Sequence, residues 1–378
     1  MWTDAIEKPT LILDPKICRG NIQRMADRAR RNQVRFRPHC KTHQSAAISE
    51  WFRDVGVDAI TVSSVEMATY FAANGWKDIT IAFTVNTRQI DDISQLLAKQ
   101  HLKLGLIVES IETVQILQKR LEHPVSIWID VDTGYHRTGI DWQNTAEIVD
   151  LAQAISASPQ TVLVGLLGHP GHTYKSTSIP EVQTIHQETV ERMNQVRDLL
   201  VATSKMTGLS ISIGDTPSCS IMEDFGGKVD EIRPGNFVFY DVMQAHIGSN
   251  QLSDIAVAVA CPVVAKNTRL RQIVVYGGAV HLSKDRIVDS RGRTNFGYLA
   301  RPTENGWDIV DEAYYVKGLS QEHGLVHADE AFMESVKVGD ILLILPIHSC
   351  LTANLLKKYK VLEGGSISMA PIPDASSL

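Results

Sequence analysis

The stretch DITIAFTVNTRQIDDISQLLAKQHLKLGLIVES, residues 78–110, reads as a strand, a helix and a second strand. Residues 78–85 and 102–110 are short apolar runs, whereas residues 87–100 carry apolar residues at helical spacing. Two strands joined by a helix form a parallel pair, because the helix returns the chain to the same end of the sheet. This stretch therefore predicts an α/β fold with a parallel sheet.

The same alternation of strand and helix continues on both sides of residues 78–110. Apolar strands are expected near residues 34, 59, 79, 104, 126, 162, 210 and 235, and a helical pattern separates each pair. Eight such units in about 220 residues suit a (β/α)8 TIM-type barrel. A doubly wound sheet is the alternative. We expect the barrel to comprise residues 15–245.

From about residue 250 the pattern changes to strands and turns with little helix. IAVAVACPVVAKNT, RQIVVYGGA and DILLILPIHSC are apolar runs of this kind. The run PTLILD, residues 9–14, has no helix before it and fits with these later strands. We therefore expect a C-terminal, mostly antiparallel β-domain that comprises residues 1–14 and 246–378.

The composition favours a cytoplasmic enzyme that acts on a small molecule. The chain has 37 basic and 43 acidic residues, a net charge of −6, and no basic cluster that would indicate nucleic acid. Five scattered cysteines do not make a disulfide framework, which predicts a reducing compartment. The start MWTDAIEKPTLILDPK has no apolar signal-peptide core. No run of about 18 apolar residues predicts a membrane span.

One lysine has unusual neighbours. In RFRPHCKTHQ, residues 35–44, Lys41 stands among a proline and two histidines, with no acidic residue close by. Lys41 follows the first expected barrel strand, and the C-terminal strand ends form the active-site face of such barrels. A lysine whose pKa is lowered by burial and by its neighbours can form an imine with an aldehyde cofactor. A lysine that pairs with a carboxylate from another strand is the alternative.

Four further motifs follow expected strand ends. They are DVDTGYHRTG (residues 130–139), GHPGHTY (168–174), GDTPS (214–218) and RPGN (233–236). Glycines and hydroxyls in turns before helices provide the N–H and O–H groups that bind phosphate. Each motif alone is a common turn, and in the first of them Asp132 and Arg137 could simply pair. Together the motifs indicate one site at the strand ends of a barrel.

The C-terminal region contributes a candidate metal pair. His348 and Cys350 in LPIHSC lie two residues apart, and on a strand or extended loop they face the same side. Imidazole and thiolate suit Zn²⁺. Two protein ligands are too few for a structural site and suit an open, catalytic metal. A histidine unrelated to a neighbouring thiol is the alternative, and His323 and His327 are a rival pair.

Together these motifs resemble those of the D-serine dehydratase and D-threonine aldolase family, fold-type III pyridoxal-phosphate (PLP) enzymes that are similar to alanine racemase. RPHCKTH resembles the cofactor-lysine segment RPHxKTxK, and DTGYHRTG resembles the DTGxxRxG stretch that alanine racemase shares. HPGHTY, GDTP, RPGNFVFYD, SQEHG and LPIHSC follow in the family's order, so the resemblance spans residues 8–360. Gln44 departs from the family, which often has Ser or Lys there. The resemblance implies a barrel plus a β-domain that includes the N-terminal strand.

The resemblance also implies a role for each residue of the site. Lys41 would carry PLP as an imine and would be the catalytic base. Arg137 would sit near the ring hydroxyl, and Arg233 is placed like the arginine that faces the ring nitrogen in alanine racemase. The other cofactor-binding residues would be His172 and Tyr174 beside the imine, and Gly214, Thr216, Gly235 and Asn236 around the phosphate. The metal ligands would be His348 and Cys350.

The metal pair points to one branch of this family. The dehydratase branch has H-x-C and takes zinc, whereas the aldolase branch usually ends the pair with Asp and takes Mn²⁺ or Mg²⁺. The resemblance therefore implies a PLP- and zinc-dependent lyase that converts a D-3-hydroxy amino acid such as D-serine to a 2-keto acid and ammonia. The alternatives are a D-threonine aldolase, a racemase with Tyr314 or Tyr315 as its second base, and a non-catalytic PLP carrier. A homodimer is expected, because in this fold the β-domain of one subunit often completes its partner's site.

Overall fold

The computed structural model describes residues 1–100 and 102–370 and divides the chain into two compact units. One unit, here the β-unit, comprises Met1–Gln23 and Asn236–Met369. The other, here the barrel unit, comprises Arg24–Gly235 and Ala370. The last eight residues of the expected β-domain, 371–378, lie outside the described residues.

The barrel unit is built on eight parallel strands. They are β2 (Arg35–Phe36), β3 (Ile60–Val62), β4 (Asp78–Thr84), β5 (Lys103–Val108), β6 (Val125–Asp132), β8 (Thr161–Gly168), β9 (Ser210–Ile213) and β10 (Glu231–Ile232). Neighbouring strands follow the order β2, β10, β9, β8, β6, β5, β4, β3, and every pair is parallel. A parallel bridge between His39 and Thr61 joins the two ends of this order. The predicted (β/α)8 barrel is thus confirmed.

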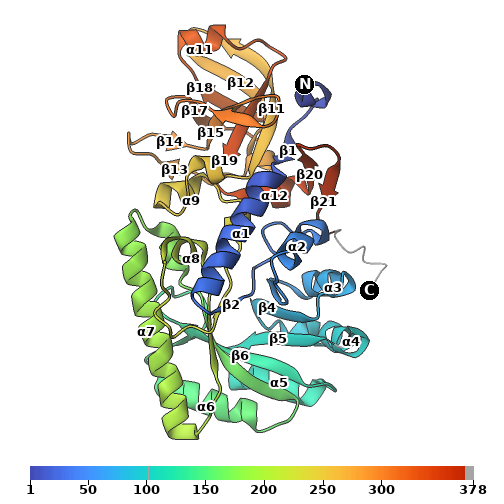
Figure 1. Ribbon diagram of the computed structural model, residues 1–378, viewed down its shortest axis with the longest axis vertical. Helices are drawn as coiled ribbons and strands as arrows, with labels where there is room; N and C mark the ends of the chain where they lie inside the picture. Colours follow the sequence, from blue (N-terminus) through green and yellow to red (C-terminus); the bar gives the residue numbers. More distant parts are fainter. Residues whose placement is uncertain (101, 371–378) are drawn as a thin grey trace. The chain divides into compact units, whose positions relative to one another are not determined.

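Helices follow the strands and lie on the outside of the barrel (Figure 1). They are α2 (Ala46–Arg53), α3 (Val65–Ala73), α4 (Ile90–Gln100), α5 (Ile111–Arg120), α6 (Thr145–Ser156), α7 (Ile179–Ser204) and α8 (Thr216–Ile221), with α1 (Pro15–Arg31) before β2 and a short strand β7 (Ile140–Asp141) beside β6. Serine hydroxyls cap the N-termini of two of these helices. Ser64 Oγ accepts from Met67 N at 3.2 Å, and Ser110 Oγ accepts from Thr113 N at 3.2 Å.

The interior of the barrel is filled by side chains of alternating size. Trp128 on β6 is buried and packs with Ile107 and Leu167. Glycines on the neighbouring strands make room for the indole, because a Cβ at Gly165 would lie 2.7 Å from its Cζ3 and a Cβ at Gly105 would lie 3.1 Å from its Nε1. The barrel is therefore a packed core, and its strand ends are free to form a site.

The β-unit contains a closed antiparallel barrel of six strands in the order β12, β18, β17, β15, β19, β11, in which β11 also pairs β12. Its strands are β1 (Thr10–Leu13), β11 (Val257–Asn267), β12 (Gln272–Tyr276), β13 (Ile287–Val288), β14 (Thr294–Asn295), β15 (Gly297–Pro302), β16 (Trp307–Ile309), β17 (Tyr315–Leu319), β18 (His323–His327), β19 (Ile341–Pro346), β20 (Lys358–Val361) and β21 (Ser366–Ser368). Its short helices are α9 (Val242–Ile247), α10 (Ala279–Leu282), α11 (Glu330–Glu334) and α12 (Ser349–Leu356). The predicted, mostly antiparallel β-domain is confirmed.

The N-terminal strand β1 belongs to this sheet, as the sequence indicated. It pairs β11 in antiparallel register and β20 in parallel register. Leu11, Ile12 and Leu13 are almost completely buried. A strand covered on both faces needs apolar residues at every position, which explains the unbroken run in PTLILD.

Among the described residues, no helix combines the length and the apolar character that crossing a membrane requires.

Candidate active site

The motifs that the sequence singled out in the barrel follow strand ends in the structure. Lys41 follows β2, Arg137 follows β6, His172 and Tyr174 follow β8 in the 3-10 turn Gly171–Lys175, Gly214 and Thr216 follow β9, and Arg233 and Gly235 follow β10. Parallel barrel strands all end at the same rim. The predicted residues of the barrel unit therefore share one face of it.

The turn that carries Lys41 is held by its backbone. Cys40 N donates to Thr61 O at 2.8 Å, and Lys41 N donates to His39 Nδ1 at 3.3 Å. His39 and His43 are buried, but the side chain of Lys41 is exposed. The expectation that Lys41 is buried is therefore wrong, because the turn places this residue at the exposed rim of the barrel.

The imidazoles around Lys41 are neutral. Burial, followed by the positive charge of Lys41, holds the pKa of His39 well below its usual range. Burial lowers the pKa of His169 to about 3, although His169 Nδ1 hydrogen-bonds Gly214 O, and Lys41 adds to the lowering. Burial also lowers the pKa of His43 to about 3. The positive charge at this rim is thus carried by lysine and arginine rather than by histidine.

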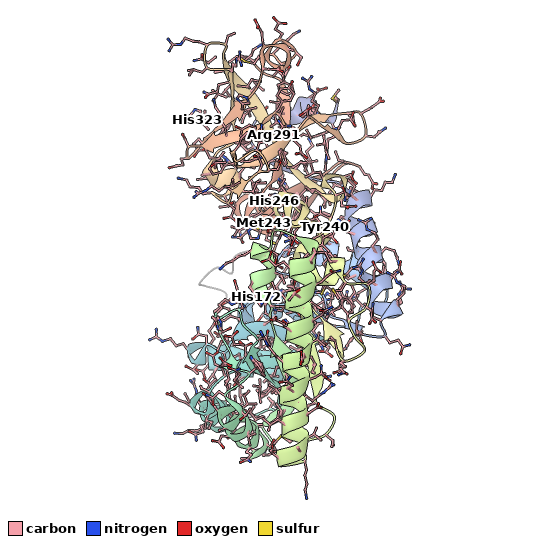
Figure 2. The ribbon with its side chains drawn as sticks, turned by 90° about the vertical axis from the view of Figure 1, so that its left-hand side faces the viewer. His172, Tyr240, Met243, His246, Arg291 and His323 are labelled. Carbon is pink, nitrogen blue, oxygen red and sulfur yellow. The ribbon has the colours of Figure 1, made fainter. Side chains whose placement is uncertain are left out.

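His169 is a residue that the sequence analysis missed. His172 was the predicted residue of GHPGHTY, but Lys41 affects the pKa of His169 and is not among the main influences on the pKa of His172. His172 lies beside α7 (Figure 2), and its ring stacks on Tyr135 at a centroid distance of 6.2 Å. The sequence could have indicated His169, because it is the first residue after strand β8 and therefore lies directly at the rim.

Two glycines allow the strand-end turns to pack closely. A Cβ at Gly214 would lie 2.7 Å from Arg233 Cβ. A Cβ at Gly235 would lie 3.0 Å from His39 O and 3.3 Å from Thr42 Oγ1. Any larger residue at these positions would push apart the turns that carry Lys41 and Arg233.

The start of α8 is built on a buried carboxylate. Asp215 Oδ2 accepts from Ser218 N and from Thr173 Oγ1, both at 2.8 Å. Burial raises the pKa of Asp215 to about 6. Thr216 N donates to Tyr174 Oη at 3.1 Å, so the phenol from the turn after β8 is fixed against this helix start.

The two arginines of the site differ in environment. Arg233 is buried, and burial lowers its pKa to about 10 although Glu231 and Asp130 oppose this. Arg137 is exposed, and its Cζ lies 5.2 Å from the centroid of the Tyr135 ring. The carboxylate of Asp132 is occupied by its own turn, because Oδ1 accepts from the N–H groups of Gly134 at 2.8 Å and of Tyr135 at 2.9 Å.

In the β-unit, His348 and Cys350 lie at the start of α12. His348 is the N-cap residue in extended conformation and Cys350 is in the first helical turn, so the prediction of a strand or loop for both is wrong. His348 Nδ1 lies 2.7 Å from Asp285 Oδ2. Burial lowers the pKa of His348, but hydrogen bonds with Asp285 and Cys350 outweigh burial and raise the pKa to about 11. The imidazole thus has a carboxylate on one nitrogen and a thiol within reach of the ring.

A second carboxylate fixes the segment between the two side chains. Asp241 is buried, and its Oδ2 accepts from Ser349 N at 3.0 Å and from Asn236 Nδ2 at 2.6 Å. Asn236 Nδ2 also lies 3.5 Å from Cys350 Sγ. The side chain of Asn236, predicted at the phosphate, is therefore engaged with the His348–Cys350 segment, which leaves only its backbone for the predicted role.

His323 and His327 do not form a metal pair. Both are on β18, four residues apart, which separates them by about 13 Å along a strand. His323 is exposed on the β-unit (Figure 2). In the part of the chain that the structure describes, no three His, Cys, Asp or Glu side chains gather as a metal site. His348 and Cys350 thus remain a two-residue candidate.

Two protein families match the chain. Residues 13–242 match "Alanine racemase, N-terminal domain" and residues 256–362 match "Putative serine dehydratase domain". The chain belongs to the alanine racemase N-terminal domain family. The two matched segments correspond to the barrel and to the C-terminal strands of the β-unit.

Several proteins that are similar to this chain over nearly its full length are dehydratases. The chain is 28% identical to the D-threo-3-hydroxyaspartate dehydratase of Delftia sp. (strain HT23), over 96% of each chain. It is 26% identical to the D-serine dehydratase of Dictyostelium discoideum, over 95% of this chain and 94% of that protein. The solved structure of the Delftia enzyme superposes with a TM-score of 0.89 at 25% identity and covers 97% of this chain and 98% of that chain. A variant of that enzyme with one cysteine replaced by alanine was solved in a metal-free form, with the same TM-score.

These comparisons confirm the predicted resemblance to the D-serine dehydratases, in the dehydratase branch of the fold-type III group. They also confirm that the chain is an enzyme similar to these lyases.

Proposed function

We propose that the protein is a PLP- and zinc-dependent dehydratase that converts a D-3-hydroxy amino acid, such as D-serine, to a 2-keto acid and ammonia. The observation that carries this proposal is the arrangement around His348, with Asp285 on Nδ1 and the thiol of Cys350 as a second hydrogen-bonding partner. Loss of a hydroxyl benefits from a metal ion, and two relatives that match over nearly their full length are dehydratases.

The rim of the barrel fits PLP. Gly214 and Gly235 form turns so close to their neighbours that a Cβ would fill the remaining space. Lys41 stands exposed beside neutral imidazoles, and Arg233 supplies a buried cation. An aldehyde that carries an anionic phosphate requires an amine and positive charge, which Lys41 and Arg233 supply, and the glycine turns permit close approach of the backbone to a phosphate.

The predicted residues would divide the cofactor site between them, with Asn236 limited to its backbone. Lys41 would bind the cofactor covalently, Arg137 would lie near the ring hydroxyl, and Arg233 would face the ring nitrogen. His172 and Tyr174 would lie near the reactive carbon. The residues around the phosphate would be Gly214, Thr216, Gly235 and the backbone of Asn236. His169 joins this set as a neutral imidazole at the rim.

The pair His348 and Cys350 fits a zinc ion better than Mn²⁺ or Mg²⁺, because thiolate is a soft ligand and the harder ions prefer oxygen. The carboxylate of Asp285 accepts the Nδ1 proton of His348 and so leaves Nε2 as the nitrogen that binds a metal. Cys350 lies in the first turn of α12, where the helix N-terminus favours an anionic ligand. Two ligands leave positions open for substrate.

When bound, PLP supplies an electron sink for charge at the substrate Cα, and zinc supplies a Lewis acid for the leaving hydroxyl. The chain itself must move the Cα proton. His39 and His169 are neutral and flank the rim, so they do not compete as cations for the substrate carboxylate. Once the substrate amine has displaced Lys41 from the cofactor, its free Nζ would be the group that takes the proton from Cα.

The test is product analysis with purified protein, PLP and Zn²⁺. D-serine, D-threonine and D-threo-3-hydroxyaspartate are each incubated with the enzyme, and keto acid, ammonia and aldehyde are measured. Equal amounts of keto acid and ammonia would support the proposal. Glycine with an aldehyde would replace it with an aldolase, and no product from any of the three substrates would reject it.

A homodimer and a cytoplasmic location stay predictions. Sedimentation of the purified protein and fractionation of cells that express it would test them.

A further inference from the structure

A series of hydrogen-bonded, buried polar side chains extends through the barrel unit, from the N-terminal ends of its strands to Arg233. The floor is a cavity of about 130 Å³ at the N-terminal ends of the strands, lined by Arg37, Asp78 and Glu231 among others. Asp78 and Glu231 are the first residues of β4 and β10. No step of the proposed reaction uses this end of the barrel.

The first part of this hydrogen-bonded series is a buried ion-pair cluster. Arg37 Nη1 donates to Asp78 Oδ1 at 2.6 Å, and Arg37 Nε donates to Glu231 Oε2 at 2.6 Å. Arg37 and Glu231 are both less than 5% exposed. A buried pair of this kind is strongly held, because removal of one partner would leave the other charged and unsolvated.

The second part leads from this cluster to the rim. Ser212 Oγ donates to Glu231 Oε1 at 2.7 Å, and Arg233 Nε donates to Ser212 Oγ at 2.7 Å. The direction of these bonds is not open to choice. A guanidinium can only donate and a carboxylate can only accept, so the hydroxyl between them must accept from Arg233 and donate to Glu231.

Arg233 is thereby fixed in orientation. Its Nη2 donates to Gly168 O at 2.8 Å, so Nε and Nη2 are both anchored inside the barrel. Among the hydrogen bonds recorded for the described residues, none uses Nη1, which is the nitrogen left to donate to a bound group. A guanidinium anchored at two nitrogens presents the third in one direction.

We propose that Ser212 and Glu231 are positioning residues that aim Arg233 at the cofactor, with the Arg37 cluster at the floor as their fixed base. This inference rests on the proposed function, because it takes PLP as the group that Arg233 meets. It goes beyond that function in assigning a role to residues that touch neither substrate nor cofactor. The electron-sink behaviour of the ring then depends on a hydrogen-bond chain that begins at the opposite end of the barrel.

Two serines on strand β9 provide a test variant and a matched control. Ser212→Ala removes the central hydroxyl, and Ser210→Ala removes a hydroxyl from the same face of β9, two residues earlier, at the floor cavity. Arg233→Gln removes the residue through which Ser212 is proposed to act. Glu231 keeps its bond to Arg37 in all three variants.

The measurement is the dissociation constant of PLP, from quenching of tryptophan fluorescence, together with the unfolding temperature of each cofactor-free protein. We expect Ser212→Ala to raise the dissociation constant about tenfold, which corresponds to about 1.4 kcal/mol. We expect Ser210→Ala to bind like the wild type. In the Arg233→Gln background, Ser212→Ala should have no further effect on PLP affinity, because its route to the cofactor is gone.

The outcomes separate this inference from the proposed function. If the wild type does not bind PLP, the proposed function fails and the inference fails with it. If the wild type binds PLP and Ser212→Ala binds equally well, the inference alone is overturned. A Ser212→Ala effect that persists in the Arg233→Gln background, or a lower unfolding temperature without weaker PLP binding, would also overturn it and leave Ser212 a structural residue.

Discussion

The carboxylate of Asp285 should control how well His348 binds a metal. In Asp285→Asn the side chain keeps its size but loses its charge, so it no longer fixes the proton on His348 Nδ1. An amide can also turn its NH2 group toward Nδ1 and place the proton on Nε2, the nitrogen that a metal needs. We therefore expect weaker zinc binding without loss of either ligand.

The size of this effect follows from the contact. The Nδ1–Oδ2 distance of 2.7 Å is that of a charge-assisted hydrogen bond, a class that contributes about 1.5–3 kcal/mol. The side chains of His348 and Asp285 are 32% and 36% exposed, and solvent screening places the contribution at the low end of that range. A loss of about 1.4 kcal/mol is a tenfold rise in the zinc dissociation constant. Substitutions behind metal ligands typically weaken binding by about 10- to 100-fold.

The assay is competition for zinc between the protein and a coloured chelator at constant pH and salt. Asp308→Asn is the matched control, because Asp308 is exposed on β16 of the same unit and undergoes the same change of charge. Cys350→Ala serves as the reference for the loss of a proposed zinc ligand. If Asp285→Asn holds zinc within twofold of the wild type, the carboxylate does not set the tautomer of His348, and the reasoning is refuted.

Four further predictions follow from single groups. Lys41→Ala should lose the absorbance of bound PLP near the visible edge, and an unchanged spectrum would reject this lysine. Cys350→Ala, or treatment of the wild type with a chelator, should stop release of keto acid from D-serine and leave that absorbance in place; a metal-free sample with full activity would contradict the zinc role. Gly235→Ala should weaken PLP binding because its Cβ would lie 3.0 Å from a backbone oxygen, whereas Gly318→Ala, with its nearest contact at 3.7 Å, should bind PLP normally in the same titration. Burial raises the pKa of Asp215 from 3.8 to about 6, so the folded state holds this proton more tightly than the unfolded chain does; urea unfolding should show stability falling as pH rises from about 4 to about 6, and Asp215→Asn, which cannot ionise, should lack that part of the fall.

The barrel could be predicted because its strands carry a strong local signal. Residues in β5 and β6 are mostly buried on both faces, so their sequences are predominantly apolar and contrast with the helices between them. The last strand, β10, has only Glu231 and Ile232, and residues 236–238 form a 3-10 turn. The sequence placed a strand near residue 235, where the structure has a turn, because a short buried turn and a buried strand have the same composition.

The contacts between motifs could not be predicted. The sequence places Ser212 and Glu231 in ordinary strands, and only the closed ring brings the hydroxyl between a carboxylate and Arg233. Asp285 and His348 are 63 residues apart, and nothing in the spacing connects them. Side-chain partners of this kind depend on strand register and on loop paths, which local patterns do not encode.

The side chains of His348 and Cys350, the predicted metal pair, come within hydrogen-bonding reach in a local structure that the sequence did not indicate. Alternation on a strand predicted that His348 and Cys350 face the same side, but the structure has an N-cap residue followed by a helical turn. In that geometry residues i and i+2 would normally diverge, since successive helical residues are about 100° apart. Here His348 is still extended, the buried carboxylate of Asp241 accepts from the N–H of Ser349 at 3.0 Å, and the two side chains stay within hydrogen-bonding reach of each other. In this chain the spacing H-x-C occurs together with that buried carboxylate, and both belong to the local geometry of the proposed metal site.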